Sequence, residues 1–225
     1  MTNTKVGTRI ADFSTQGWID ITIPLHHGMV HWPGEPVQTK FLHHMDHGDP
    51  VNLSEISMNT HSGTHFDAPR HFYKDGITSD LMPLDMGIGL ARVIEIQDRV
   101  SIKIKELEAH NIQPGERLLF KTCNALKVVQ TDNFFVDYVY FEIDAAHYLA
   151  GKGIRMVGMD YMSVGNKKDE INMFETHRAF LSKGVWILES LDLSTVKPGI
   201  YEFICLPIKI AQGEGGPCRA IIKPL

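Results

Sequence analysis

The sequence predicts a mixed α/β fold (α+β), in which mixed β-sheets are combined with short helices in a single domain, residues 1–225. Strand-like segments alternate with short helical segments only in the middle and later parts of the chain, and the first third is mostly strand and loop. No G-x-G-x-x-G or Walker pattern follows a predicted strand, which argues against a doubly wound nucleotide-binding fold. The length of 225 residues fits one hydrophobic core, and no repeat or linker divides the chain.

The first half of the chain contains two predicted strands, a loop and a short helix. Trp18–Ile23 alternates after a glycine and ends at a proline, which is typical of a strand. His31–Pro36, with the sequence HWPGEP, is rich in turn-forming residues and is predicted to be a loop. Ala91–Ile96 has the pattern of a strand. Ile104–His110 suits a short helix, because a proline and a glycine stop it a few residues later.

The second half contains two further predicted helices, Asp144–Ala150 and Phe174–Lys183, because a glycine follows directly after each segment. The remaining strands are predicted at Arg117–Thr122, Tyr138–Glu142, Ile154–Met159, Val185–Leu193 and Tyr201–Leu206. The glycine-rich stretch GEGGP, residues 213–217, follows no strand-to-helix pattern and is interpreted as a simple turn.

Charge and composition exclude several classes of partner. The net charge of −5 favours neither a nucleic acid nor an acidic lipid surface as a partner. The longest apolar runs, 138–141 and 185–188, are much shorter than the roughly 20 residues of a membrane span. The first 16 residues lack the apolar core of a signal peptide. The cysteines are odd in number and widely separated, which indicates free thiols in a reducing compartment, so we predict a cytoplasmic protein: Cys123, Cys205 and Cys218.

Residues that carry chemistry are concentrated in HSGTHFDAPRHF, a stretch that begins at His61. Its three histidines and its aspartate share one parity, so on a strand they face one side: His61, His65, Asp67 and His71. A flat strand separates His61 and His65 by about 13 Å, which strains binding of both to one metal ion. We therefore predict that a bend at Gly63 brings His61, His65 and Asp67 together as metal ligands. The alternative is a polar loop in which these side chains satisfy turn hydrogen bonds.

Two polar residues far along the chain are further candidate ligands. Glu189 interrupts an apolar face in VWILESLDL, and a buried carboxylate needs a cation or a metal ion as its partner. A salt bridge to Arg178 explains Glu189 equally well. His177 shares a helical stripe with Phe174 and Leu181, which taken alone favours a hydrogen-bonded core histidine. Because Glu189 follows twelve residues after His177, a helix–turn–strand hairpin would bring both to one site.

The motif H-x-G-T-H-x-D-x-P-x-H-F resembles the signature of the metal-dependent cyclase-like hydrolase family, to which bacterial kynurenine formamidases and isatin hydrolases belong. Other segments resemble the family in the expected order: HWPGEP, VGMDYMS, THRAFLSKGVWILESLDL and YEFICLPIKIAQGEGGPCRAII. Met162 departs from the family pattern, because many formamidases carry proline there. Five N-terminal histidines lie outside the signature and are interpreted as ordinary loop residues: His26, His27, His43, His44 and His47.

The resemblance implies a swivelling β/β/α fold, a homo-oligomer such as a dimer or tetramer, and two divalent metal ions, Zn²⁺ or in some members Mn²⁺. The ligands that it implies for the first ion are His61, His65, Asp67 and Glu189. The ligands that it implies for the second ion are Asp67, His177 and Glu189, so that both carboxylates bridge the ions. It further implies that His71 is the proton donor and acceptor, and that Trp32 contacts an aromatic substrate.

The predicted activity is hydrolysis of an amide-type C–N bond in a small molecule, either an aryl formamide such as N-formylkynurenine or a lactam. A metal ion lowers the pKa of bound water to about 7, which gives hydroxide at neutral pH, and His71 carries a proton to the leaving nitrogen. No G-x-S-x-G elbow is present, so Ser163 is a structural or substrate-binding candidate; Asp160 is expected to brace a turn. Two alternatives stay open: a metal-dependent lyase or cyclase acting through an enolate, and a non-enzymatic metal-binding protein.

Overall fold

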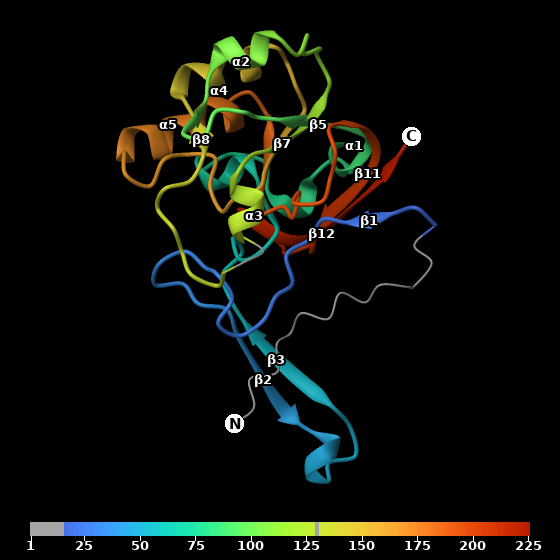
Figure 1. Ribbon diagram of the computed structural model, residues 1–225. Helices are drawn as coiled ribbons and strands as arrows, with labels where there is room; N and C mark the ends of the chain where they lie inside the picture. The colour runs from blue at the N-terminus through green and yellow to red at the C-terminus, as the bar shows by residue number, and fades with distance from the viewer. Residues whose placement is uncertain (1–15, 129–130) are drawn as a thin grey trace.

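The computed structural model describes residues 16–128 and 131–225, and its main feature is an eight-stranded sheet that closes into a barrel (Figure 1). The strands of this sheet are β1 (Ile19–Asp20), β4 (His65–Asp67), β5 (Ile88–Glu95), β7 (Arg117–Lys121), β9 (Met156–Met159), β10 (Trp186–Glu189), β11 (Gly199–Pro207) and β12 (Gly215–Pro224). Their order is β1-β12-β11-β5-β7-β9-β10-β4, and β4 closes the barrel because it also pairs with β12. The neighbours from β5 to β10 are parallel and the other pairs are antiparallel, as expected for a mixed sheet.

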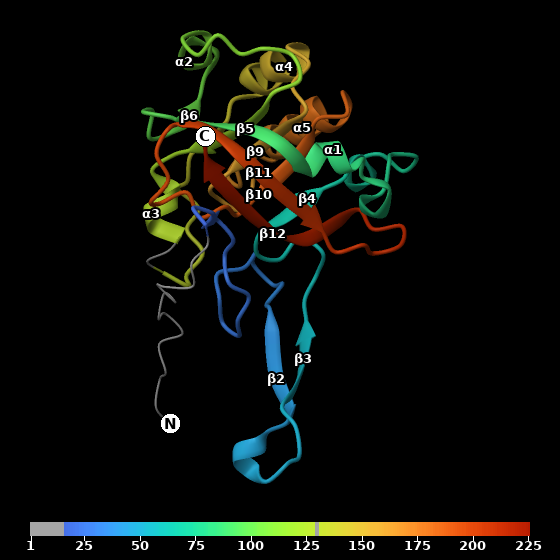
Figure 2. The same cartoon turned by 90° about the vertical axis from the view of Figure 1, so that its right-hand side faces the viewer.

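Short helices accompany the barrel, and together with the mixed sheet they confirm the predicted fold class. The helices are α1 (Leu84–Gly87), α2 (Ile104–Glu108), α3 (Asn124–Val128), α4 (Ile143–Gly151) and α5 (Glu170–Leu181). Helices α2, α4 and α5 gather on one side of the barrel in both views (Figures 1 and 2). Asp169 begins α5, because its side chain accepts hydrogen bonds from the backbone N–H groups of Ile171 and Asn172. None of the helices in the described residues has the length and hydropathy of a membrane span.

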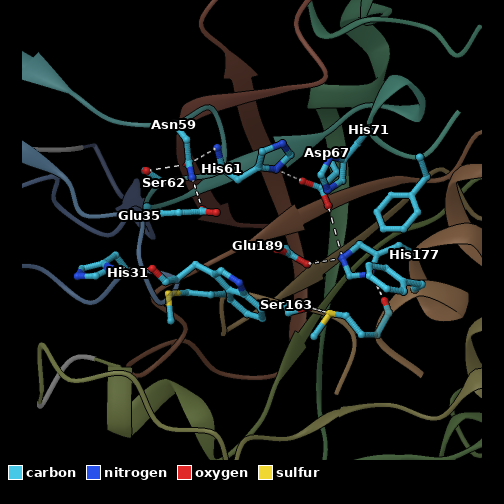
Figure 3. Close-up of a pocket in the computed structure, with 16 residues that line it drawn as sticks. His31, Glu35, Asn59, His61, Ser62, Asp67, His71, Ser163, His177 and Glu189 are labelled. Carbon is cyan, nitrogen blue, oxygen red and sulfur yellow. Dashed lines mark hydrogen bonds and ion pairs between the residues drawn. The ribbon is translucent and has the colours of Figure 1, made fainter. Parts of the chain in front are cut away.

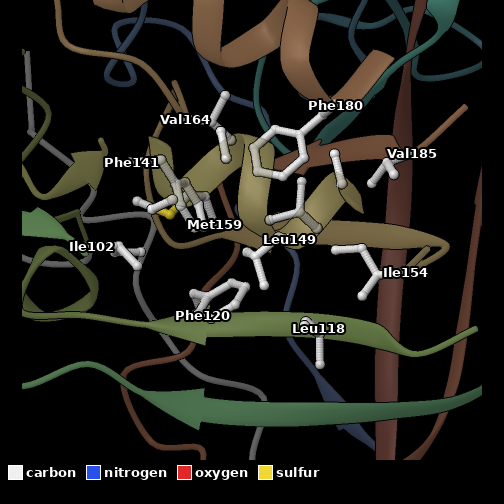
Figure 4. Packing of buried hydrophobic residues seen from close by; sticks show 14 of the residues in the cluster. Ile102, Leu118, Phe120, Phe141, Leu149, Ile154, Met159, Val164, Phe180 and Val185 are labelled. Atoms are coloured by element: carbon white, nitrogen blue, oxygen red, sulfur yellow. The ribbon is translucent and has the colours of Figure 1, made fainter. Parts of the chain in front are cut away.

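Apolar side chains pack on both faces of the central strands. One cluster lies between these strands and helices α4 and α5, and includes Phe120, Leu149 and Phe180 (Figure 4). The second cluster includes Phe66 and Trp186, on two strands that are neighbours in the barrel. Strands that are covered on both faces have almost continuous apolar sequences, which explains runs such as the VWIL segment at 185–188.

Two small sheets complete the fold. The first is a hairpin of β2 (Gln38–His43) and β3 (Leu53–Ser57), and the second pairs β6 (Ser101–Ile102) with β8 (Tyr140–Phe141). The β2–β3 hairpin projects from the body of the protein, with a 3₁₀ turn, Met45–His47, near its tip (Figures 1 and 2). Nearly all of the residues in its two strands are exposed.

Several predicted elements exist with different bounds. The helix predicted at Phe174–Lys183 begins four residues earlier, at Glu170, directly after the Asp169 cap. The strand predicted at Val185–Leu193 ends at Glu189, because Ser190 has a positive φ of 59° and turns the chain. The interpretation of residues 213–217 as a simple turn is wrong for their second half, since β12 begins at Gly215.

Other predicted strands are shorter than expected. The segment Trp18–Ile23 forms only the two-residue β1 and an isolated bridge from Thr22 to Leu191. The strand predicted at Tyr138–Glu142 is reduced to the two-residue β8. Both segments are edge strands, where few backbone partners are present to extend the pairing.

Candidate metal centre

The polar residues of the HSGTHFDAPRHF motif, which begins at His61, converge where β4 begins. Gly63 has a φ of +63°, which confirms the predicted bend, and a Cβ atom there would lie 2.6 Å from the Leu25 Cδ2 atom. After the bend, His65 and Asp67 share one face of β4. One ligand atom from each of three side chains lies within 4.8 Å of the others: His61, His65 and Asp67.

Two remote elements bring further candidate ligands to the same point. Glu189, the last residue of β10, is paired directly with His65 of β4. His177 projects from α5 toward both carboxylates (Figure 3). Its Nε2 atom is 3.4 Å from the Glu189 Oε1 atom and 3.8 Å from the Asp67 Oδ2 atom. Asp67, His177 and Glu189 therefore form a second compact group of donor atoms, and Asp67 belongs to both groups.

Hydrogen bonds fix the orientation of two of the imidazoles. The Nδ1 atom of His65 is 2.8 Å from the Gly63 carbonyl oxygen, and that of His177 is 2.6 Å from the Met173 carbonyl oxygen. A carbonyl oxygen only accepts, so each Nδ1 carries the proton and each Nε2 presents a lone pair. The His65 Nε2 atom is buried without a hydrogen-bond partner in the described residues, 3.4 Å from Asp67 Oδ1 and 3.5 Å from Glu189 Oε2.

The electrostatics of the centre favour positive charge. Burial alone would raise the pKa of Asp67, but the charges and hydrogen bonds of His61 and His65 outweigh burial and hold that pKa well below its usual range. The pKa values of all three imidazoles are raised despite burial, because Asp67 and Glu189 stabilise their protonated forms. The shifts of Asp67 and of the imidazoles have the same cause, which is the attraction between the buried carboxylates and positive charge.

The donor set fits a divalent metal ion. Three imidazoles and two carboxylates are the ligand types that Zn²⁺ and related ions prefer, and an unpartnered buried nitrogen such as His65 Nε2 requires a partner. We conclude that this cluster is a candidate metal centre.

A cavity of about 270 Å³ opens beside the centre, large enough for a small molecule. Trp32 lies in its wall, where its ring packs edge-on against Phe134 with 5.4 Å between ring centroids. The Phe72 ring stacks on the His177 ring at 5.0 Å. Aromatic and sulfur-containing side chains therefore surround the polar centre on one side: Trp32, Phe72, Met162, Met173 and Phe174.

His71 lies at the rim of this cavity, directed toward the other imidazoles (Figure 3). Its ring is 4.1 Å from the His61 ring, although the residue as a whole is exposed. Desolvation of the packed part and the neighbouring imidazoles lower the pKa of His71 to about 4, although Asp67 acts in the opposite direction. Its imidazole is therefore neutral at pH 7 and lies within the same cavity as the metal centre.

The Cyclase family model, described as "Putative cyclase", matches residues 19–166, more than half of the chain. This protein belongs to the cyclase family. The resemblance inferred from the motif H-x-G-T-H-x-D-x-P-x-H-F is thereby confirmed. The cluster formed around β4, β10 and α5 is the candidate metal centre of a cyclase-family protein.

Similar proteins agree with this assignment. The chain is 36% identical to a kynurenine formamidase of Bacillus cereus over 213 residues, which cover 94% of this chain and 99% of the relative. A solved structure described as a potential metal-dependent hydrolase with cyclase activity superposes with a TM-score of 0.79 at 31% identity, covering 91% of this chain and 96% of the other. Isatin hydrolase A from Ralstonia solanacearum shares the fold, with a TM-score of 0.79 at 21% identity and 92% coverage of each chain.

The remaining predictions about individual residues have clear outcomes. The proposed salt bridge between Glu189 and Arg178 is wrong, because Arg178 pairs with Glu175 at 2.6 Å. Ser163 lines the cavity, and its hydroxyl oxygen accepts a hydrogen bond from the Gly165 N–H group. The predicted bracing role fits Asp160, whose carboxylate accepts hydrogen bonds from Thr122 and Ala125 at the start of α3. The five extra N-terminal histidines are not among the described residues that line the cavity.

Two contacts of the centre were not predicted from the sequence. The backbone N–H of Val164 donates to Glu189 Oε1 at 2.8 Å and holds that carboxylate in place. Gly215 packs against the His61 ring, and a Cβ atom there would lie 2.7 Å from the ring atom Cε1. The only signal for this second contact was the glycine-rich stretch itself, whose position in the fold the sequence pattern did not reveal.

Proposed function

We propose that this cyclase-family protein hydrolyses an aryl formamide, N-formylkynurenine being the best candidate, with two divalent ions, Zn²⁺ or Mn²⁺. The relatives named kynurenine formamidase confirm the predicted class of enzyme, a metal-dependent amide hydrolase with a small-molecule substrate. The alternatives of a lyase or a metal-binding protein without activity receive no support from these relatives. The substrate, the identity of the metal and the count of two ions are our proposals.

One observation carries the proposal of two ions: each carboxylate directs its two oxygens to different imidazoles. For Asp67, Oδ1 lies 3.4 Å from His65 Nε2 and Oδ2 lies 3.8 Å from His177 Nε2. For Glu189, Oε2 lies 3.5 Å from His65 Nε2 and Oε1 lies 3.4 Å from His177 Nε2. This arrangement supports the proposal that His61 and His65 would hold one ion and His177 the other, with Asp67 and Glu189 as ligands available to both.

The metal ions, when bound, lower the pKa of water and polarise the substrate carbonyl group. His71 supplies the other requirement of amide hydrolysis, a proton carrier. Its neutral imidazole takes up a proton as the nucleophile forms and delivers a proton to the leaving nitrogen. The Trp32 and Phe72 rings hold the aromatic part of the substrate and exclude water from one side of the cavity.

A substrate screen tests the proposal. The purified protein, loaded with Zn²⁺ or with Mn²⁺, is incubated with N-formylkynurenine, other aryl formamides, isatin and simple esters, and formate or ring opening is followed. We expect the aryl formamides to give the highest kcat/KM, and the Asp67→Ala variant to lose turnover. Failure of every amide and lactam with the metal-loaded protein would contradict the assignment, and a faster reaction with isatin would move the substrate class to lactams.

We further propose that the protein is a homo-oligomer, with the β2–β3 hairpin in contact with a second copy. Two-stranded hairpins are marginally stable alone, and this one exposes six large apolar side chains: Phe41, Leu42, Met45, Val51, Leu53 and Ile56. At its base the hairpin is connected to the HWPGEP segment, which contributes Trp32 to the cavity wall, and to the motif that begins at His61.

Size-exclusion chromatography with light scattering measures the mass of the eluted protein and so tests the proposed oligomer. Phe41 and Ile56 share one face of the hairpin, so Phe41→Ser with Ile56→Ser removes apolar contact area from that face. We expect this double variant to elute as a monomer. The control Lys40→Ser breaks an exposed ion pair with Glu55 on the same hairpin and should keep the oligomer. A monomeric unsubstituted protein would contradict the proposal.

A further inference from the structure

The three imidazoles of the centre are not oriented alike. His65 and His177 each donate from Nδ1 to a backbone carbonyl oxygen and present Nε2 to the carboxylates. His61 is reversed, because its Nδ1 atom faces the centre, 2.8 Å from Asp67 Oδ1. Its Nε2 atom points away from Asp67 and is buried without a hydrogen-bond partner in the described residues. An imidazole that binds a metal through one nitrogen normally donates a proton from the other to an acceptor.

The acceptor nearest to this nitrogen is a carboxylate that has no assigned role. Glu214 Oε1 lies 3.6 Å from His61 Nε2, just beyond hydrogen-bond distance. The Glu214 side chain is 44% exposed and that of His61 is 20% exposed, so the two meet at the edge of the centre. Glu214 comes from the segment before β12, about 150 residues from His61 along the chain.

The fold holds Glu214 at this place through contacts on both sides. The Thr60 hydroxyl donates a hydrogen bond to Glu214 Oε1. The Glu214 backbone carbonyl accepts from the Ala68 N–H group at 2.9 Å, directly after β4. Gly215, the next residue, pairs with Asp67 and leaves the space that the His61 ring occupies. Gly215 is therefore required for the close approach of the Glu214 segment to the segment that carries His61.

We propose that Glu214 is a positioning residue for His61: its carboxylate accepts the Nε2 proton and thereby keeps the lone pair on Nδ1 for the metal ion. This inference rests on the proposed function and extends it to a residue outside the ligand set. A carboxylate acceptor also makes the imidazole a stronger ligand, as carbonyl acceptors do for His65 and His177. His61 is thus the one ligand in the described residues whose orientation depends on an exposed side chain.

Metal affinity is the first test. Dissociation constants for Zn²⁺ alone and Mn²⁺ alone are measured by chelator competition for the unsubstituted protein, Glu214→Ala and Glu214→Gln. We expect about 10- to 100-fold weaker binding for Glu214→Ala. Glu214→Gln retains an acceptor oxygen without the charge, so its dissociation constant should lie between those of the unsubstituted protein and Glu214→Ala. Because Glu214 is partly exposed, the variants should fold, which thermal unfolding checks.

A matched control separates this role from general loosening of the loop. Asp80 accepts a hydrogen bond from the Gln212 N–H group at 3.1 Å and anchors the same segment without contacting His61. Asp80→Ala should therefore keep the metal affinity of the unsubstituted protein. Equal weakening by Asp80→Ala and Glu214→Ala would overturn the proposal, because the effect would then come from the loop as a whole.

The ring nitrogens themselves provide the second test. In protein labelled with ¹⁵N-histidine and loaded with Zn²⁺, long-range ¹H–¹⁵N spectra report which nitrogen of each ligand carries the proton. We expect a protonated Nε2 for His61 and a protonated Nδ1 for His65 and His177. In Glu214→Ala only the His61 signals should change. Metal binding through His61 Nε2, or unchanged affinity in Glu214→Ala, would overturn the proposal.

Failure of this inference is distinguishable from failure of the proposed function. If the unsubstituted protein binds and hydrolyses but Glu214→Ala matches it in affinity, only the role of Glu214 is wrong. If the unsubstituted protein binds neither ion, both the proposed function and the role of Glu214 are wrong.

Discussion

His65 on β4 lies directly opposite Glu189 on β10, and the His65 Nε2 and Glu189 Oε2 atoms are 3.5 Å apart. The pairing register therefore determines which side chains meet. A shift of one residue would turn every side chain of the strand to the opposite face of the barrel wall. The same register pairs Asp67 with Ile187, so both ligands of β4 stay on the face that carries Glu189.

Asp67→Asn should weaken metal binding at both proposed positions, because Asp67 belongs to both groups of donor atoms. The amide keeps one weak oxygen ligand and loses the charge that His61 and His65 stabilise. Elemental analysis after dialysis is expected to give well under half the metal content of the unsubstituted protein. Full occupancy in the variant would remove Asp67 from the bridging position.

His71→Asn should retain metal and lose turnover. His71 contributes no atom to either compact group of donors, yet its ring lies 4.1 Å from that of His61. General acid–base catalysis contributes about 10²- to 10⁴-fold, and we expect kcat to fall by a factor in this range. Metal analysis and steady-state kinetics on the same preparation check both parts. Turnover close to that of the unsubstituted protein would exclude His71 as the proton carrier.

Removal of metal should lower the thermal stability. The buried carboxylates of Asp67 and Glu189 lose their strongest partner when a chelator removes the ion. At a free metal concentration one hundred times Kd, binding contributes about 2.7 kcal/mol to the free energy of unfolding. Scanning calorimetry with and without Zn²⁺ should show the corresponding rise in Tm. The rise should disappear in Asp67→Asn; an equal rise there would indicate binding elsewhere.

Asp160 should make stability depend on pH. Burial raises the pKa of Asp160 to about 6, although hydrogen bonds from Thr122 and Ala125 act against this shift. The folded state therefore holds more protons than the unfolded state between about pH 4 and pH 6. The contribution of Asp160 to the free energy of unfolding is complete below about pH 4 and is lost as the pH rises through 6.

Asp160→Asn should remove this part of the pH dependence, since an amide does not titrate. It should also destabilise the protein by about 1–3 kcal/mol. The N–H groups of Thr122 and Ala125 donate to the carboxylate, and the amide NH₂ group of asparagine would place a second donor against them. Urea unfolding at pH 5 and pH 7 measures both effects. Asp144→Asn, at an exposed position on α4, is the control and should change little.

Local rules were sufficient for the first part of the site. The equal parity of His61, His65 and Asp67 and the need for a bend at Gly63 follow from strand geometry and ligand reach, and the structure contains that bend. The link to Glu189 was harder. The spacing of the residues did not decide whether the partner of Glu189 is a metal ion or Arg178. The pairing of β10 with β4 decides which groups the Glu189 carboxylate meets.

Features formed between distant segments could not be predicted in this way. The stretch around Glu214 shows no periodicity, and its role depends on β12 pairing with β4, which no local pattern encodes. The β2–β3 hairpin was also missed, because its strands are exposed on both faces and lack the alternation that marks a half-buried strand. The end of β10 depends on the positive φ of Ser190, the residue that follows it. Sequence-based conformational propensities rarely reveal such a backbone conformation for serine.

Closure of the barrel by β4 has a consequence for biosynthesis. His65 and Asp67 are made early, but β4 gains its two neighbours only when β10 and then β12 have been translated. Until then, His65 and Asp67 lack the neighbouring strands that hold them in the folded protein. We therefore expect the candidate metal centre to assemble only after β10 and β12 have been translated, because these strands hold β4 in place.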